Sequence, residues 1–97
     1  VLYDQKKHAA AVIHAGWRGS TQRISQKAVM CMRENFGTDS SDLRVFFGPS
    51  AKKCCYQVGS DFQYNFSSFS YANEVFAVRN NYLYFDLPLF NILQLQE

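Results

Sequence analysis

The sequence predicts a small domain in which helices and short strands are combined. Short apolar runs separated by polar turns are typical of strands. Apolar residues recur at helical spacing between Ile24 and Phe36, and Asn80-Asn81 separates two further apolar runs as a hairpin turn would. The chain has 97 residues, of which 47% are hydrophobic, so one hydrophobic core is feasible.

The first elements that we expect are two strands, over residues 1–3 and 9–14, joined by the polar turn 4–7. The second strand is an almost continuous apolar run, which is typical of a buried strand. His14 ends this run. We therefore expect its imidazole to lie at the end of a buried strand and to point into a cleft.

A helix follows this strand and is the most clearly marked element of the sequence. Gly16 and Gly19 bracket a tight strand-to-helix turn, and Ser20 or Thr21 is suited to cap the helix. Gly37 ends it. The predicted apolar face consists of Ile24, Ala28, Cys31, Met32 and Phe36.

The second half of the chain predicts shorter elements. Asp86 is suited to cap a last helix that carries Leu87, Phe90 and Leu93, with Pro88 tolerated in the first turn. Before it we expect a strand over 43–47, a turn over 48–50, an extended segment over 55–58, a brief helix with Phe62 and Phe66 on one side, and a hairpin of 75–78 with 82–85.

Composition and charge exclude several classes of protein. The formal net charge is +2 and the basic residues are scattered, which argues against nucleic-acid binding. The sequence contains neither an apolar run of membrane-spanning length nor a signal-peptide pattern. The odd set of cysteines, Cys31, Cys54 and Cys55, argues against a secreted disulfide scaffold. We therefore expect a soluble, cytoplasmic protein with reduced thiols.

Both ends of the sequence have the character of interrupted elements. The first three residues already resemble a strand, and the helical apolar pattern continues through 93–97. We expect the chain to be a fragment of a longer domain.

The segment His14-Ala15-Gly16-Trp17-Arg18-Gly19 is the first place where chemistry concentrates. An imidazole and a guanidinium beside the free N–H groups of a helix start favour an anion such as phosphate. The alternative is structural: His14 as a hydrogen-bonded core residue, Trp17 as packing and Arg18 as a surface cation. Spacing alone leaves both interpretations open.

The second place is the loop Gly48–Gly59, which contains Cys54 and Cys55 next to Lys52 and Lys53. Nearby positive charge lowers the pKa of a thiol, and a histidine elsewhere in the fold would serve as its base. The alternative is a tight loop with one cysteine turned inward as a small apolar residue and two solvated lysines.

Taken together, these segments resemble a known family. The resemblance rests on His-Ala-Gly-Trp-Arg-Gly at 14–19, Gly-Pro-Ser at 48–50, Cys-Cys-Tyr-Gln-Val-Gly at 54–59, and Phe85-Asp86-Leu87 with Asn91 and Leu95. The sequence is similar to the polyphenol oxidase or laccase-domain family, whose members are regarded as zinc-dependent purine nucleoside phosphorylases with additional adenosine deaminase activity. The family pattern differs at Ala51-Lys52-Lys53, where Ile-Gly and a variable residue are usual, and at Gln57, where Glu is usual.

The resemblance implies an α+β fold with layered mixed β-sheets and outer helices, of which residues 1–97 form part of one domain. It implies that the substrates are a purine nucleoside and phosphate, and that zinc is held by two histidines and one cysteine. His14 matches one zinc-binding histidine, whereas the other two ligands match positions upstream of Val1. Arg18 matches a phosphate or substrate contact at the pocket's edge, with Trp17 and Gly19 beside it as substrate-binding positions.

Three interpretations therefore remain. The first is part of a zinc-dependent purine nucleoside phosphorylase. The second is a cysteine hydrolase with Cys54 or Cys55 as nucleophile and His14 as base. The third is a non-catalytic remnant that keeps the fold but not the site.

Overall fold

The computed structural model describes residues 1–96 and divides the chain into two compact units, Val1–Gly48 and the chain from Pro49 onward. Each unit contains helices together with a three-stranded sheet. This confirms the predicted α+β class. The described strand pairings are all antiparallel, so the sheets are not mixed within this part of the chain.

The sheet of the first unit has the order β2-β1-β3. It consists of β1 (Leu2–Asp4), β2 (Ala9–Ala11) and β3 (Leu43–Val45). The second strand is shorter than the predicted range 9–14. Strand β2 ends at Ala11, and the next side chain, Val12, is 85% exposed. Ala11 pairs with Leu2, and the backbone groups of Val1 are hydrogen-bonded to Phe46, which follows β3 on the opposite side of β1. The backbone ladder of β2 therefore stops there.

Asp4 shapes the turn between β1 and β2. Its side chain is fully buried, and Oδ1 accepts hydrogen bonds from the backbone N–H groups of Lys6 at 2.9 Å and Lys7 at 3.0 Å. The pKa of Asp4 lies below its ordinary value, chiefly because of the Thr38 hydroxyl and also because of these N–H groups, while burial opposes the shift. An ionised carboxylate thus holds the turn that leads into β2.

The predicted helix is divided in two, α1 (Trp17–Thr21) and α2 (Ile24–Phe36). Arg23 lies between them in the left-handed region with φ 64°, which breaks the helix. The expected cap at Ser20 or Thr21 is wrong. Ser20 is buried inside α1, and the Thr21 hydroxyl donates to the Arg18 carbonyl instead.

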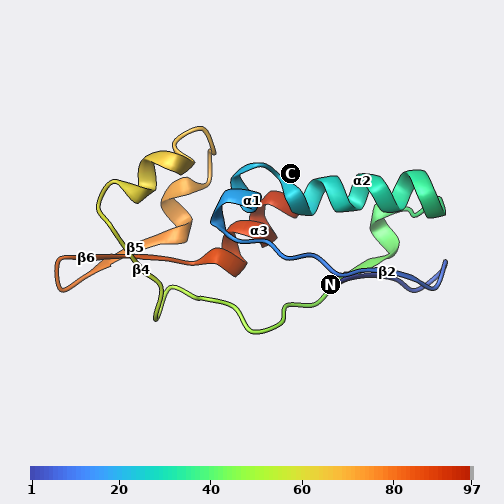
Figure 1. Cartoon of the computed structure of the whole chain (residues 1–97), viewed down its shortest axis with the longest axis horizontal. Coiled ribbons are helices and arrows are strands. Elements are labelled where there is room, and N and C mark those ends of the chain that lie inside the picture. The colour runs from blue at the N-terminus through green and yellow to red at the C-terminus, as the bar shows by residue number, and fades with distance from the viewer. Residues whose placement is uncertain (97) are drawn as a thin grey trace. The chain divides into compact units, whose positions relative to one another are not determined.

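Helix α2 carries the predicted apolar positions and ends where predicted, but it begins later than the expected cap and buries less of its apolar face than we expected. Among its apolar positions, Met32 is buried, whereas Cys31 and Phe36 are exposed. Gly37 ends the helix with φ 68°, and its N–H donates to the Arg33 carbonyl at 3.1 Å. The helix runs as one continuous rod in Figure 1.

The sheet of the second unit has the order β4-β6-β5. Strands β5 (Phe76–Arg79) and β6 (Tyr82–Phe85) form the predicted hairpin, with β4 (Gln57–Val58) on the other side of β6. Asn80 and Asn81 both have positive φ, 51° and 67°, as a type I′ turn requires. The strands lie side by side, and β6 leads directly into the last helix of the chain (Figure 1).

Helix α3 (Leu87–Leu95) begins as predicted, because the Asp86 side chain accepts from the Leu89 N–H at 3.0 Å and Pro88 lies in the first turn. The predicted helical pattern extended to Glu97, which lies outside the described residues. Three short 3₁₀ helices complete the chain: η1 (Ser40–Asp42), η2 (Phe62–Phe66) and η3 (Ala72–Val75). None of the described helices combines the length and apolar character that crossing a bilayer requires.

The core of the second unit is aromatic. Phe66, Phe85 and Phe90 are fully buried. The ring of Phe66 lies 4.8 Å from that of Phe85 and 4.9 Å from that of Phe90, measured between centroids. The rings meet in tilted and edge-to-face arrangements, which aromatic pairs prefer. This cluster joins η2, β6 and α3.

Gly37 gives a direct test of the helix end. We expect Gly37→Ala to lower the free energy of unfolding by about 1 kcal/mol, because an alanine in the left-handed region is strained. The nearest atoms to an added Cβ are in the Lys7 side chain at 3.9 Å, so no clash contributes. Gly48→Ala is the matched control, since Gly48 has no positive φ and nothing within 4 Å of its added Cβ. Denaturant unfolding of both variants would measure the difference, and equal stabilities would contradict the assignment.

Candidate functional site

The segment His14–Gly19 forms a hollow on the first unit. Its lining consists of His14, Gly16, Trp17, Arg18 and Gly19, and its volume is about 280 Å³. After β2 ends, the chain is irregular as far as Gly16, whose extended backbone directly precedes α1. The motif therefore lies at a loop-to-helix junction, where polar side chains are not committed to a sheet.

His14 lines this hollow from an irregular segment and not, as we expected, from the end of a strand. It is exposed and lies three residues beyond the last residue of β2 rather than at the end of a buried strand. A Cβ added at Gly16 would lie 3.8 Å from the His14 Nε2 atom. The imidazole thus lies against the turn that begins α1, and the predicted burial of the strand is wrong.

Arg18 is held in place by its neighbour. Its guanidinium carbon lies 4.6 Å from the centre of the Trp17 ring, within the range of a cation–π contact. The side chain is exposed and lines the same hollow as His14. The structure therefore brings the two groups of the motif to one concave surface.

Gly19 lies inside a helix and not, as we expected, in the turn before it. It lies inside α1, because the helix begins at Trp17 and not after Gly19. A Cβ added there would meet Ile24 Cγ2 at 3.5 Å, an ordinary contact. Within the described residues, the backbone at Gly19 therefore does not require glycine, and the expected helix start after Gly19 is wrong.

Zinc needs more donors than this hollow supplies. Structural and catalytic zinc sites use at least three protein ligands. Among residues 1–96, no group of three or more His, Cys, Asp or Glu side chains is arranged to hold a metal ion. His14 is the only imidazole in the lining of the hollow. The described residues thus fit one corner of a zinc site and not a complete one.

The second predicted place, around Cys54 and Cys55, belongs to the second unit. Both cysteines are exposed, so neither is turned inward, and their Sγ atoms lie 2.9 Å apart. The pKa of Cys55 is raised, chiefly by its side-chain contact with Cys54, while Arg79 opposes the shift. An activated cysteine nucleophile has a lowered pKa instead.

The cysteine hydrolase interpretation also lacks a base in this unit. Both histidines of the sequence, His8 and His14, precede Gly48. Lys52 is exposed as predicted, but Lys53 is half-buried. Nothing in the second unit therefore supports a Cys–His pair.

Arg79 is a residue that the sequence did not single out. Its guanidinium lies 4.1 Å from the centre of the Tyr84 ring and donates to the carbonyls of Lys53 and Cys54 at 2.7 and 2.9 Å. Its proximity to Tyr84 has a signal in the sequence, because side chains two residues apart on a strand lie on the same face. Arg79 pairs with Tyr82, and Tyr84 lies two residues farther along the same strand. Its hydrogen bonds to residues 52–56, the cysteine turn, have no such signal in the sequence.

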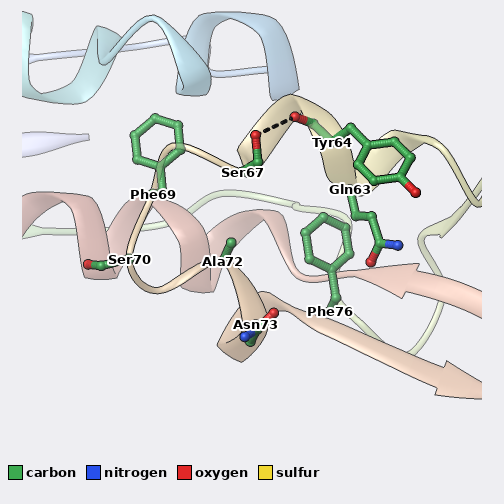
Figure 2. Close-up of a pocket in the computed structure, with 8 residues that line it drawn as sticks. All are labelled: Gln63, Tyr64, Ser67, Phe69, Ser70, Ala72, Asn73 and Phe76. Carbon is green, nitrogen blue, oxygen red and sulfur yellow. Dashed lines mark hydrogen bonds between the residues drawn. The ribbon is translucent and has the colours of Figure 1, made fainter.

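A second hollow, in the second unit, has a different chemistry. It lies beside η2, η3 and the start of β5, and Figure 2 shows the Gln63 amide next to the Phe76 ring. The Ser67 hydroxyl is already used, because it donates to the Tyr64 carbonyl at 3.1 Å. No charged side chain lines this hollow. It therefore offers no cation for phosphate, unlike the hollow at Arg18.

Comparison with known proteins identifies the family. All 97 residues match the family described as multi-copper polyphenol oxidoreductase laccase. The chain belongs to this family. The resemblance inferred from the motifs is thereby confirmed for this laccase-type family.

Relatives in the laccase-type family carry names from nucleoside metabolism. The chain is 36% identical to a purine nucleoside phosphorylase of Borreliella burgdorferi, over 94% of this chain and 41% of that protein. It is also 36% identical to the adenosine deaminase RL5 of an unknown prokaryotic organism, over 63% of this chain and 23% of that protein. The chain thus spans well under half the length of these relatives.

A solved structure shows the same fold. The crystal structure of the hypothetical protein YfiH from Bacillus licheniformis matches 98% of this chain with a TM-score of 0.83, at 22% sequence identity. The match covers 37% of the YfiH chain. The fold of the chain is therefore that of a part of the YfiH structure.

The donor set predicts how the 97-residue chain responds to zinc. One imidazole binds zinc weakly, so titration by calorimetry should give no tight one-to-one binding. Any weak signal from the thiols should be unchanged in His14→Ala. Tight binding that His14→Ala abolishes would contradict this expectation and would mean that Cys54 or Cys55 completes a site with His14.

Proposed function

We propose that this chain is part of a zinc-dependent purine nucleoside phosphorylase that cleaves nucleosides of the adenosine and inosine type with phosphate. The observation that carries the proposal is the shared hollow of His14 and Arg18 in a laccase-type chain. A relative aligned over 94% of the chain bears the name purine nucleoside phosphorylase. The activity is proposed for the longer protein and not for these residues alone.

Phosphorolysis needs an anion site beside a site for a flat base. A phosphate oxygen attacks the sugar carbon, the electron pair of the N-glycosidic bond goes to the base, and the base leaves with a proton. We assign Arg18 to the phosphate, because a guanidinium holds two phosphate oxygens at once. Trp17 supports the guanidinium through its ring face, and we assign Trp17 and Gly19 to the substrate-binding surface of the hollow.

We assign His14 as one zinc ligand, with the remaining ligands outside residues 1–97. An exposed imidazole at the edge of the hollow suits a metal shared with other segments. When bound, zinc would act as a Lewis acid or activate a water molecule. The described residues supply only one corner of the zinc site.

Adenosine deamination is a second candidate activity for the same site. It is favoured by the similarity to a relative named adenosine deaminase. Deamination needs a metal-activated water and no phosphate, so the two activities differ in their dependence on phosphate. We propose it as an additional activity of the longer protein.

The deciding experiment is an assay of the full-length, zinc-loaded protein with adenosine and inosine. Phosphate-dependent release of free adenine or hypoxanthine is the expected result. Formation of inosine from adenosine without phosphate would show deamination. Absence of both reactions in the folded protein would contradict the proposal and would favour a non-catalytic remnant.

Arg18→Lys in the full-length protein tests the phosphate assignment. A lysine offers a point charge in place of a two-pronged contact. We expect the KM for phosphate to rise about tenfold, a loss of about 1.4 kcal/mol, while the KM for the nucleoside and the zinc content stay unchanged. Arg44→Lys is the matched control, because Arg44 is exposed on β3 and does not line the hollow. Steady-state kinetics with varied phosphate measure both variants, and an unchanged phosphate dependence in Arg18→Lys would remove Arg18 from the site.

A further inference from the structure

Cys54 and Cys55 form an exposed pair of adjacent thiols that the proposed function does not use. Their sulfur atoms lie 2.9 Å apart in hydrogen-bond contact. The pair occupies a turn, because the N–H groups of Cys55 and Tyr56 both donate to the Lys52 carbonyl, at 3.0 and 2.9 Å. Both cysteines are therefore exposed on one short, hydrogen-bonded segment.

Arg79 fixes this turn from the hairpin. One guanidinium nitrogen, Nη2, donates to the carbonyls of Lys53 and Cys54, and the guanidinium lies over the Tyr84 ring. The Arg79 side chain thus links β5 to two backbone carbonyls of the turn, and the Tyr84 ring on β6 supports its guanidinium. The backbone that carries the two thiols is therefore held by Arg79 as well as by the hydrogen bonds of the turn itself.

The donor set restricts what the pair can bind. Among the described residues, no third His, Cys, Asp or Glu side chain completes a metal site with the two thiols. A centre that needs three or four protein donors therefore does not fit, which excludes tight zinc binding here. Thiolates select soft centres. Two sulfur atoms on one side of a turn also suit a pyramidal centre better than one that prefers two opposed ligands in a line.

A trivalent organoarsenical meets all of these conditions. Arsenic is soft and pyramidal, takes two sulfur donors, and brings its third substituent with it. We propose that Cys54 and Cys55 form a chelating site for trivalent arsenicals, preformed by a turn whose backbone Arg79 holds. With an arsenic oxide R–As=O, two As–S bonds form, the two thiol protons leave with the oxide oxygen as one water molecule, and arsenic remains trivalent.

Phenylarsine oxide is the probe for this site. We expect the reduced 97-residue chain to form a one-to-one adduct, seen by intact mass spectrometry, with loss of two of its three titratable thiols. The adduct should survive an excess of a monothiol and be removed by a dithiol, because only a second chelate competes with two linked donors. Loss of a single thiol, or release by the monothiol, would overturn the proposal.

Matched cysteine variants separate the pair from the third thiol. Cys54→Ser and Cys55→Ser should each bind the arsenical roughly a hundredfold more weakly, since the second donor no longer benefits from a high effective concentration. Cys31→Ser should bind as the unchanged chain does, because Cys31 lies in α2 of the other unit. Equal affinity in Cys54→Ser and the unchanged chain would overturn the assignment to this pair.

A separate measurement tests whether Arg79 holds the turn that carries Cys54 and Cys55. Arg79→Gln should weaken arsenical binding several-fold while the circular dichroism spectrum and the two-thiol stoichiometry stay the same. The chain unfolded in urea should likewise bind more weakly than the folded chain, because the hydrogen-bonded turn is lost. Affinities that match the unchanged folded chain in both cases would show that the site is not preformed by the fold.

Discussion

The packing of aromatic rings around Phe66 holds the second unit together. Phe66 lies on η2, Phe85 on β6 and Phe90 on α3, so one cluster joins three elements that are distant in sequence. A unit of this size buries little surface, and large flat rings give the most buried area per residue. The hairpin that carries Arg79, and with it the cysteine turn, depends on this packing.

The first unit is organised differently, with few buried apolar side chains and several buried polar ones. Leu2 and Met32 are its buried apolar residues, whereas Asp4, Ser20, Ser25 and Thr38 are buried polar residues. Hydrogen bonds to Asp4 shape the turn into β2, and the left-handed Arg23 separates α1 from α2. The unit that carries the hollow at His14 and Arg18 is therefore organised more by polar contacts and backbone conformation than by an apolar core.

The two sites illustrate different ways of arranging reactive groups. At the hollow, a short segment supplies an imidazole and a guanidinium, and the Trp17 ring orients the latter. At the cysteine turn, the reactive groups are adjacent in sequence, and a distant arginine fixes their backbone. In both places an aromatic ring supports an arginine, since a ring face orients a guanidinium without removing its hydrogen-bond donors.

The sequence by itself determined the elements whose signals are local: the end of α2 at Gly37, the Asn80-Asn81 hairpin and the Asp86 cap. It also determined the family, through motifs that occupy consecutive positions. Only the tertiary structure decided where β2 ends, that α1 separates from α2, and that Arg79 reaches the cysteine turn. The physical reason is that strand length depends on the backbone of a partner strand, and long-range hydrogen bonds depend on packing between distant segments. Strand length and long-range hydrogen bonds therefore leave no pattern in the sequence of the element itself.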